Sequence, residues 1–569
     1  MCRNAWKKVT SILLIIGLLT GTASVITGCG SKNDDVITLD VYSQLTTYSG
    51  KQIGWIADIL KKKFNVQLNI IPDAEDVYKN RAEDGDLGDI VVWSNDNDKY
   101  PSAVKEKLLY DWNNEELLSK HGKYIKDHMA IALRKNQSLT SFITGGASDT
   151  LYGFGHNVAT SSKDHATFFY TWDTRWDLYK KLGYPEIRNL DDYRVLMKKM
   201  QKLSPKGLSG KKTYAMSLWP DWDEAMVMYV KAAATAYYGY DELGIGLYDP
   251  QTGDYHDALQ QNGPYLELLK FFNDLYQDKL LDPESRTQSY ERMIEKLMDD
   301  RVLFSIFNYA GSQTYNKKKQ MDDGKYMASV KPEEASPIVY GMNAQGGERI
   351  WSIGAKTEYP ELCMKVINYL CTPEGRLTTE YGPKGVCWDY DKQKNTYFTK
   401  LGRDCYENND TMMRDGYKGK FSDGMLKISN STWSIDASNP DSNEETYNCK
   451  SWKSNQEKSD CAMEKDWRTK RKATTADELI ERGNYVLSPG TSYTQSEKSD
   501  ELKVTWEQVT KELVEGSWDA IYAKTDAEFD KIVSQMRKTC EKYGYEECVD
   551  WSANEAVRRK NLEDAVREE

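Results

Sequence analysis

The chain has 569 residues, a formal net charge of −12 and 29% charged residues. This length exceeds what one ordinary hydrophobic core holds, and it predicts two or three lobes. The acidic balance argues against a nucleic-acid partner and against direct binding to anionic lipid.

The N-terminus has the order of a secretory signal. Basic residues open it, residues 11–26 form an apolar run, and Thr27-Gly28-Cys29 closes it. The apolar run is shorter than the roughly 20 residues of a membrane-spanning helix. A small residue directly before a cysteine resembles the lipobox of bacterial lipoproteins, which implies a signal peptide over 1–28, a diacylated Cys29 and a tether over 29–36. The alternative is an ordinary secreted protein with a cysteine near its cleavage site.

The next segment predicts a parallel sheet. Residues 37–42, 66–71 and 89–93 have the pattern of strands, residues 54–64 have helical spacing, and residues 73–85 are a polar helix or loop. Strands that alternate with helices pair in parallel through right-handed crossovers. Ligands collect beyond the carboxyl ends of such strands, so we expect a binding edge there.

The middle of the chain alternates further helices and strands. A Gly-rich segment at 151–156 leads into a strand and a helix that stops near Gly183, and Asn189 or Asp191 then caps another helix. We predict helices at 192–203, 223–238, 265–278, 290–300 and 360–370, and strands at 213–219, 302–307 and 350–353.

Cysteines beyond Cys2 and Cys29 number eight, and all lie late in the chain. An exported chain can oxidise such residues, and Cys540 and Cys548 flank a possible loop closure. Cys449 and Cys461 flank a polar stretch. No CxxC or HExxH spacing occurs, so we expect no metal and no other cofactor.

Four stretches in the expected order resemble one family. "TPEGRLTTEYGPKGVCWDYD" at 372–391 resembles the signature of extracellular solute-binding lipoproteins of ABC carbohydrate transporters (family 1), and "IGAKTEYPELCMKVINYL" precedes it. "WDTRWDLYKKLGYPEIRNLDDYRVLMKKM" at 172–200 and the tail at 514–551 resemble further parts of that family, in particular its oligosaccharide-binding LplA-like branch. The polar stretch from Cys387 to about Ser488 departs from the pattern.

The resemblance implies an α/β fold of the type II periplasmic-binding-protein-like class. Two discontinuous α/β lobes would be joined by crossing strands, with a ligand cleft between the lobes. We expect lobe 1 at 37–150 and 310–375, and lobe 2 at 151–309 and 376–569.

Aromatic residues indicate how a sugar would be held. The chain has 38 Tyr and 16 Trp but only 12 Phe, and Tyr and Trp combine an apolar face with a polar edge. The hydroxyls of a sugar need donors and acceptors beside such rings. At predicted strand ends and crossings we therefore expect the ligand-binding residues Ser43, Gln44, Trp93, Asn95, Asp96, Trp219, Asp221, Trp222, Asn308, Tyr309, Trp351 and Trp388.

The resulting hypothesis is a lipid-anchored receptor on the extracellular face of a Gram-positive cell membrane. It would be a monomer that captures an oligosaccharide and delivers it to the permease subunits of an ABC importer, with no catalytic residue and no nucleic-acid partner. One alternative is a lipid-anchored glycoside hydrolase, which needs two carboxylates about 5–10 Å apart. Another is a peptide-binding or adhesin lipoprotein.

Overall fold

The computed structural model describes residues 36–74, 76–161, 164–456 and 461–567. The predicted signal peptide, the lipidation site Cys29 and the tether up to residue 35 lie outside these described residues. Contacts separate Met1–Val36 from Ile37–Glu569, and every described helix and strand lies in the second unit. In the part of the chain that the structure describes, no helix is both long and apolar enough to cross a bilayer.

The N-terminal part forms a six-stranded sheet with the order β2-β3-β1-β4-β13-β5. β1 pairs in parallel with both β3 and β4, which confirms the predicted pairing. β13, from far along the chain, is antiparallel to β4. The strands are β1 (Ile37–Ser43), β2 (Gly50–Lys51), β3 (Val66–Pro72), β4 (Ile90–Val92), β5 (Phe154–Gly155) and β13 (Ile350–Ile353).

Helix boundaries around this sheet follow local signals. α1 ends where Asn65 adopts the left-handed conformation and its N–H reaches the carbonyl of Lys61. Pro360 and Pro373 each occupy a first helical turn, where a missing N–H costs nothing. The helices are α1 (Gly54–Phe64), α2 (Val77–Asp84), α3 (Lys99–Lys105), η1 (Asn114–Glu116), α4 (Leu117–His121), α5 (Lys123–His128), α6 (Ala130–Thr144), α14 (Pro360–Cys371) and α15 (Pro373–Tyr381).

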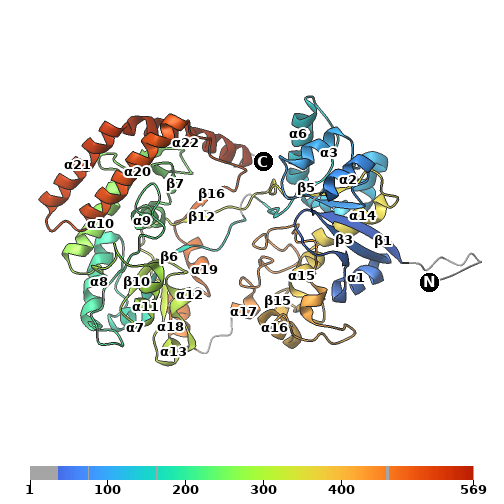
Figure 1. Ribbon diagram of the computed structural model, residues 1–569. Coiled ribbons are helices and arrows are strands. Elements are labelled where there is room, and N and C mark those ends of the chain that lie inside the picture. The colour runs from blue at the N-terminus through green and yellow to red at the C-terminus, as the bar shows by residue number, and fades with distance from the viewer. Residues whose placement is uncertain (1–35, 75, 162–163, 457–460, 568–569) are drawn as a thin grey trace, which may run out of the picture. The chain divides into compact units, whose positions relative to one another are not determined.

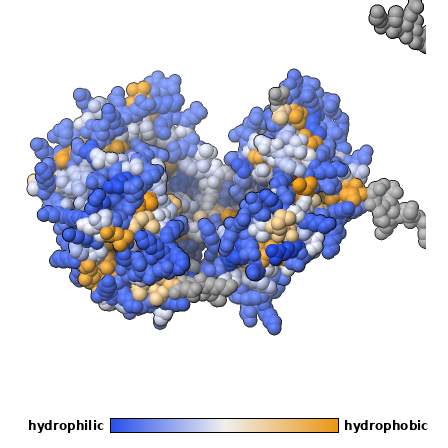
Figure 2. All heavy atoms as spheres, turned by 60° about the horizontal axis from the view of Figure 1, so that its bottom comes forward, coloured by the Kyte–Doolittle hydropathy of each residue, from blue (hydrophilic) through white to orange (hydrophobic). Residues whose placement is uncertain are grey.

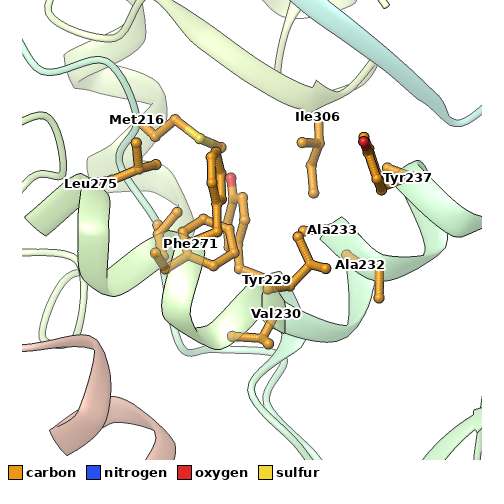
Figure 3. Close-up of a cluster of buried hydrophobic side chains, with 14 of the residues drawn as sticks. Met216, Tyr229, Val230, Ala232, Ala233, Tyr237, Phe271, Leu275 and Ile306 are labelled. Atoms are coloured by element: carbon orange, nitrogen blue, oxygen red, sulfur yellow. The ribbon is translucent and has the colours of Figure 1, made fainter. Parts of the chain in front are cut away.

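A second sheet has the order β10-β6-β11, with β6 (Tyr170–Arg175) in the centre. β10 (Phe304–Phe307) and β11 (Met327–Ser329) are both antiparallel to β6. Near it lie α7 (Trp176–Lys181), α8 (Leu190–Leu203), α9 (Met228–Tyr238), α10 (Pro264–Gln277), α11 (Tyr290–Met298), α12 (Ser312–Tyr315) and α13 (Lys318–Asp322). Figure 3 shows Tyr229 of α9 and Phe271 of α10 in the buried apolar contact between these two helices.

Smaller sheets and late helices complete the fold. A three-stranded sheet contains β7 (Asp241–Leu243), β8 (Gly246–Tyr248) and β9 (Tyr255–Asp257), while β12 (Ile338–Tyr340) pairs in parallel with β16 (Val486–Ser488), and β14 (Trp388–Tyr390) pairs with β15 (Thr396–Phe398). The late helices are α16 (Lys400–Glu407), η2 (Phe421–Gly424), α17 (Lys453–Gln456), α18 (Ala462–Arg471), α19 (Ala476–Glu481), α20 (Asp500–Ile521), α21 (Asp526–Tyr543) and α22 (Tyr545–Arg567). The last three pack side by side (Figure 1). The predicted mixed α/β class is confirmed.

Two large hydrophobic clusters divide the sequence differently from the expected lobes. One runs from Leu39 to Val158 and returns from Trp351 to Trp452. The other runs from Tyr170 to Ile338 and returns from Trp467 to Cys548. The segment after residue 310 thus stays with the second cluster, because β11 pairs with β6. The segment after residue 376 stays with the first, because the ring of Tyr381 packs on Phe398 and Trp452.

The predicted strand at 213–219 is not formed. This segment makes only isolated bridges, from Tyr214 to Val302 and from Met216 to Leu281. Its backbone hydrogen bonds go to two different neighbours, since Tyr214 donates to Arg301 and Ala215 donates to Leu280. Neither contact continues beyond a single bridge, so the segment forms no ladder with either neighbour.

All eight cysteines within the described residues are buried, and all are free thiols. Cys540 lies in α21 and Cys548 lies in α22, so the expected loop closure between them is absent among the described contacts. Cys363 and Cys371 both lie in α14.

Hydrophilic residues cover most of the face shown in Figure 2, and hydrophobic patches on it are small and scattered. This agrees with a charged fraction of 29%. Exposed large apolar side chains such as Phe142 are single positions of the kind that soluble proteins tolerate. Trp222, at 45% exposure, differs because it belongs to a cluster of rings.

Candidate functional site

Aromatic rings gather where the turn Trp219-Pro220-Asp221-Trp222 meets the end of β10. The ring of Trp222 lies 5.0 Å from that of Tyr290, 6.0 Å from that of Tyr309 and 5.3 Å from that of Trp219, centroid to centroid. Phe169 lies 5.0 Å from Tyr309. Trp219 is fully buried beneath the cluster, whereas Trp222 and Phe169 are each more than 40% exposed. The structure therefore brings together Trp219, Trp222 and Tyr309 among the predicted residues.

Two aspartates hold the turn that carries Trp222. Asp221 accepts a hydrogen bond of 2.7 Å from the N–H of Tyr290, at the first turn of α11. Asp223 accepts one of 2.7 Å from the N–H of Met228, at the first turn of α9, and another from the indole of Trp518. Carboxylates satisfy the free N–H groups of a helix start and match its dipole. The turn is thus fixed between the first turns of α11 and α9. The carboxylate of Asp221 serves this structural contact instead of a ligand contact.

The sheet places the remaining rings. In the ladder between β6 and β10, Phe307 is opposite Tyr170. Phe169 and Tyr309 lie one residue before β6 and two residues after β10, and the N–H of Asn308 donates to the carbonyl of Phe169 at 2.9 Å. Antiparallel pairing therefore sets the rings of the two strand ends side by side.

These rings form one wall of a cavity of about 460 Å³, which we call the ring pocket. Met228, Lys231, Ala232 and Thr235 of α9 supply another wall, because their spacing puts them on one face of the helix. The full lining is Phe169, Tyr170, Trp222, Met228, Lys231, Ala232, Thr235, Asp241, Glu242, Phe307, Tyr309 and Tyr340.

The polar side of the ring pocket is made of ion pairs. Lys231 pairs with Oε2 of Glu242. Asp241 pairs with Arg559 at 2.6 Å and accepts a hydrogen bond of 2.8 Å from the hydroxyl of Tyr340. Burial raises the pKa of the Glu242 carboxyl, and it raises the pKa of the Tyr340 hydroxyl well above its ordinary value.

This arrangement fits a ligand that has a flat apolar face and a rim of hydroxyls. Exposed faces of Trp222 and Phe169 can cover the apolar face. The carboxylates of Asp241 and Glu242 and the hydroxyl of Tyr340 can pair with the rim.

Three predicted tryptophans lie elsewhere, and each is fully buried. The indole of Trp93 donates to Ser352 at 3.2 Å, that of Trp351 donates to the carbonyl of Ser431 at 2.7 Å, and that of Trp388 donates to the carbonyl of Gly382 at 2.8 Å. Trp93 packs against Tyr100 of α3, which covers its ring. In this structure none of the three offers a ring face to a ligand, because each belongs to a hydrophobic core.

The predicted polar residues at the first sheet form local contacts. Ser43 is buried and donates to the carbonyl of Ile428 at 2.9 Å, and Gln44 accepts from the N–H of Ser94 at 3.0 Å. Asn95 donates to the hydroxyl of Ser94 at 3.2 Å, and Asp96 is half-buried. These residues share the carboxyl edge of β1 and β4, as predicted, but they are not part of the ring pocket.

Asn308 occupies a different position from its neighbour Tyr309. Its amide donates to the carbonyl of Phe168 at 2.6 Å. It lines a second, more polar cavity of about 710 Å³, together with residues such as Gln313 and Asp477. Burial raises the pKa of Asp477 to about 7.

Of the twelve residues that line the ring pocket, only Trp222 and Tyr309 are among the predicted ligand-binding residues. The Phe168-Phe169-Tyr170 run at the start of β6 is the one clear signal, because three consecutive rings exceed what one face of a strand can bury. Lys231, Asp241 and Glu242 carry no such signal, since charged residues on a helix and a short strand usually face solvent.

The family comparison agrees with this architecture. Residues 55–382 match the family of bacterial extracellular solute-binding proteins. No curated protein sequence matches the chain.

Solved structures similar to the chain include an extracellular solute-binding protein from Bifidobacterium longum subsp. infantis, at 12% identity and a TM-score of 0.49, covering 93% of this chain and 100% of that one. An HMO binding ABC-transporter associated solute-binding protein from Bifidobacterium longum infantis has 12% identity, a TM-score of 0.47 and coverages of 91% and 98%. The N-glycan transport solute-binding protein NgtS from Streptococcus pneumoniae has 13% identity, a TM-score of 0.43 and coverages of 92% and 99%.

The matched segment contains β4, β6, β10, β13 and every residue of the ring pocket. Of the four stretches that carry the family resemblance, it contains those at 172–200 and 353–370 and the first part of that at 372–391, and the tail at 514–551 lies outside it. The chain belongs to the bacterial extracellular solute-binding proteins.

Proposed function

We propose that this solute-binding protein is a lipid-anchored receptor that captures an oligosaccharide in the ring pocket and delivers it intact to an ABC importer. The observation that carries the proposal is the ring pocket itself: exposed faces of Trp222 and Phe169 beside carboxylates and a tyrosine hydroxyl. The apolar CH face of a pyranose packs on an aromatic face, and its hydroxyls pair with the polar wall. Two of the similar proteins are described as HMO-binding and as serving N-glycan transport.

Calorimetric titration with a panel of neutral oligosaccharides tests the binding function. We expect at least one member to bind with micromolar or tighter affinity and to raise the melting temperature, since a ligand that binds only the folded state stabilises it. Chromatography of the ligand after long incubation should recover it unchanged. Cleaved product would identify a hydrolase instead, and binding of peptides without any glycan would identify a peptide receptor.

The anchor at Cys29 is tested by its own variant. Cys29 follows Gly28 at the end of the apolar run, and two acyl chains at about 0.8 kcal/mol per buried CH₂ give stable membrane attachment. We expect Cys29→Ala to abolish incorporation of labelled palmitate in cells. Cys2→Ala is the matched control, because it also removes a cysteine of the leader and should leave labelling intact. Equal labelling of wild type and Cys29→Ala would contradict the anchor.

A further inference from the structure

The charged side chains in the polar wall of the ring pocket each form an ion pair with a residue of opposite charge. Lys231, on the inner face of α9, has a side chain only 9% exposed and is bound to Glu242. Asp241 is bound to Arg559 of α22, whose guanidinium also pairs with Glu563 at 2.9 Å. Among the described residues that line the pocket, Lys231 is the only cation, and it already has its counterion.

An acidic sugar would meet this wall unfavourably. Its carboxylate would lie near two carboxylates, Asp241 and Glu242, and would have to displace Glu242 to reach Lys231. Displacement would leave a partly buried carboxylate without its partner, and like charges at an interface are strongly disfavoured. An uncharged hydroxyl requires no displacement, because it can donate to a carboxylate oxygen that stays paired with its cation. Lys231 binds Oε2 of Glu242, and the Glu242 side chain remains about one-third exposed.

We infer that the ring pocket selects uncharged sugars and rejects those that carry a carboxylate, such as uronic acids. This inference rests on the proposed carbohydrate function and adds the charge class of the ligand. The residues that impose the selection are Glu242 and Asp241, and Lys231 and Arg559 hold them in place.

Matched sugars test the selection in the wild-type protein. The probes are neutral hexose di- to heptasaccharides and the same compounds oxidised at every C6 to uronic acids. Calorimetric titration near neutral pH should show that the best neutral binder loses at least about tenfold in affinity on oxidation. Equal or tighter binding of the oxidised compound overturns the inference and leaves the proposed function standing. Failure of both series to bind overturns the proposed function and the inference together.

A variant identifies the responsible group. Glu242→Gln keeps the size of the side chain, removes its charge and frees Lys231. The ratio of the affinity for the neutral sugar to the affinity for the oxidised sugar should therefore fall by at least about threefold. Glu501→Gln, on the exposed first turn of α20 and outside the pocket lining, should leave the ratio unchanged. Asp241→Asn provides a second variant if Glu242→Gln does not fold. A ratio that stays at the wild-type value in a folded variant overturns the assignment.

Discussion

Replacing Trp222 by alanine should weaken oligosaccharide binding by about 2 kcal/mol, a roughly 30-fold rise in Kd. The ring lies 5.0 Å from that of Tyr290 and 6.0 Å from that of Tyr309. Because it is an indole and is 45% exposed, it is the largest aromatic surface in the pocket that a ligand can reach. Its removal deletes the stacking surface and leaves the hydroxyl partners in place. Calorimetric titration with the best neutral binder measures the change.

Two controls separate stacking from general damage. Phe142→Ala removes a ring that is 85% exposed on α6 and outside the ring pocket, and binding should not change. Trp222→Phe keeps an aromatic face and should recover part of the affinity. The melting temperature without ligand should stay close to that of the wild type, because an exposed ring contributes little to the core. A Trp222→Ala protein that binds within about threefold of the wild type contradicts the pocket as the site.

Replacing Lys296 by alanine should lower the free energy of unfolding by about 3–5 kcal/mol. Lys296 and Asp282 are each only 1% exposed and pair at 2.6 Å. The ammonium also donates to Gln288 at 2.5 Å, and Asp282 accepts from the hydroxyl of Ser217 at 2.7 Å. Without the lysine, the carboxylate of Asp282 stays buried with no counterion, which is the costly state. Urea denaturation followed by circular dichroism measures the loss.

A surface pair and a double variant complete this test. Lys318→Ala breaks an ion pair with Asp322 in which the lysine is 86% exposed, and it should give no measurable change. Adding Asp282→Asn to Lys296→Ala removes the unpaired charge and should recover part of the lost stability. A loss below about 1 kcal/mol for Lys296→Ala, or no recovery in the double variant, would contradict this prediction. It would show that the buried pair contributes little to stability.

Much of the fold could be predicted because its signals are local. α1 begins at Gly54 and ends at Phe64, as its helical spacing predicts, since Asn65 readily adopts the left-handed conformation that stops it. α8 begins at Leu190 because the side chain of Asn189 accepts from the N–H of Asp192. The assignment of late segments to the two clusters was not predictable in this way, because it depends on which distant strand or ring each segment meets.

The candidate site shows the same division. Trp222 and Tyr309 could be predicted from strand ends and a Trp-rich turn, and the structure sets their rings 6.0 Å apart. Trp93 follows a strand in the same way but is covered by Tyr100 from the next helix, which no local pattern reveals. Glu242 lines the pocket and pairs there with Lys231, a contact between a helix and a short strand that no local pattern reveals.

A structure of the complex with the best-binding neutral oligosaccharide would show whether the ring pocket holds the sugar. We expect a pyranose ring with its CH face against Trp222 and its hydroxyls within hydrogen-bond distance of Glu242 or Asp241. A sugar bound with full occupancy elsewhere, with the ring pocket free of ligand, would contradict it.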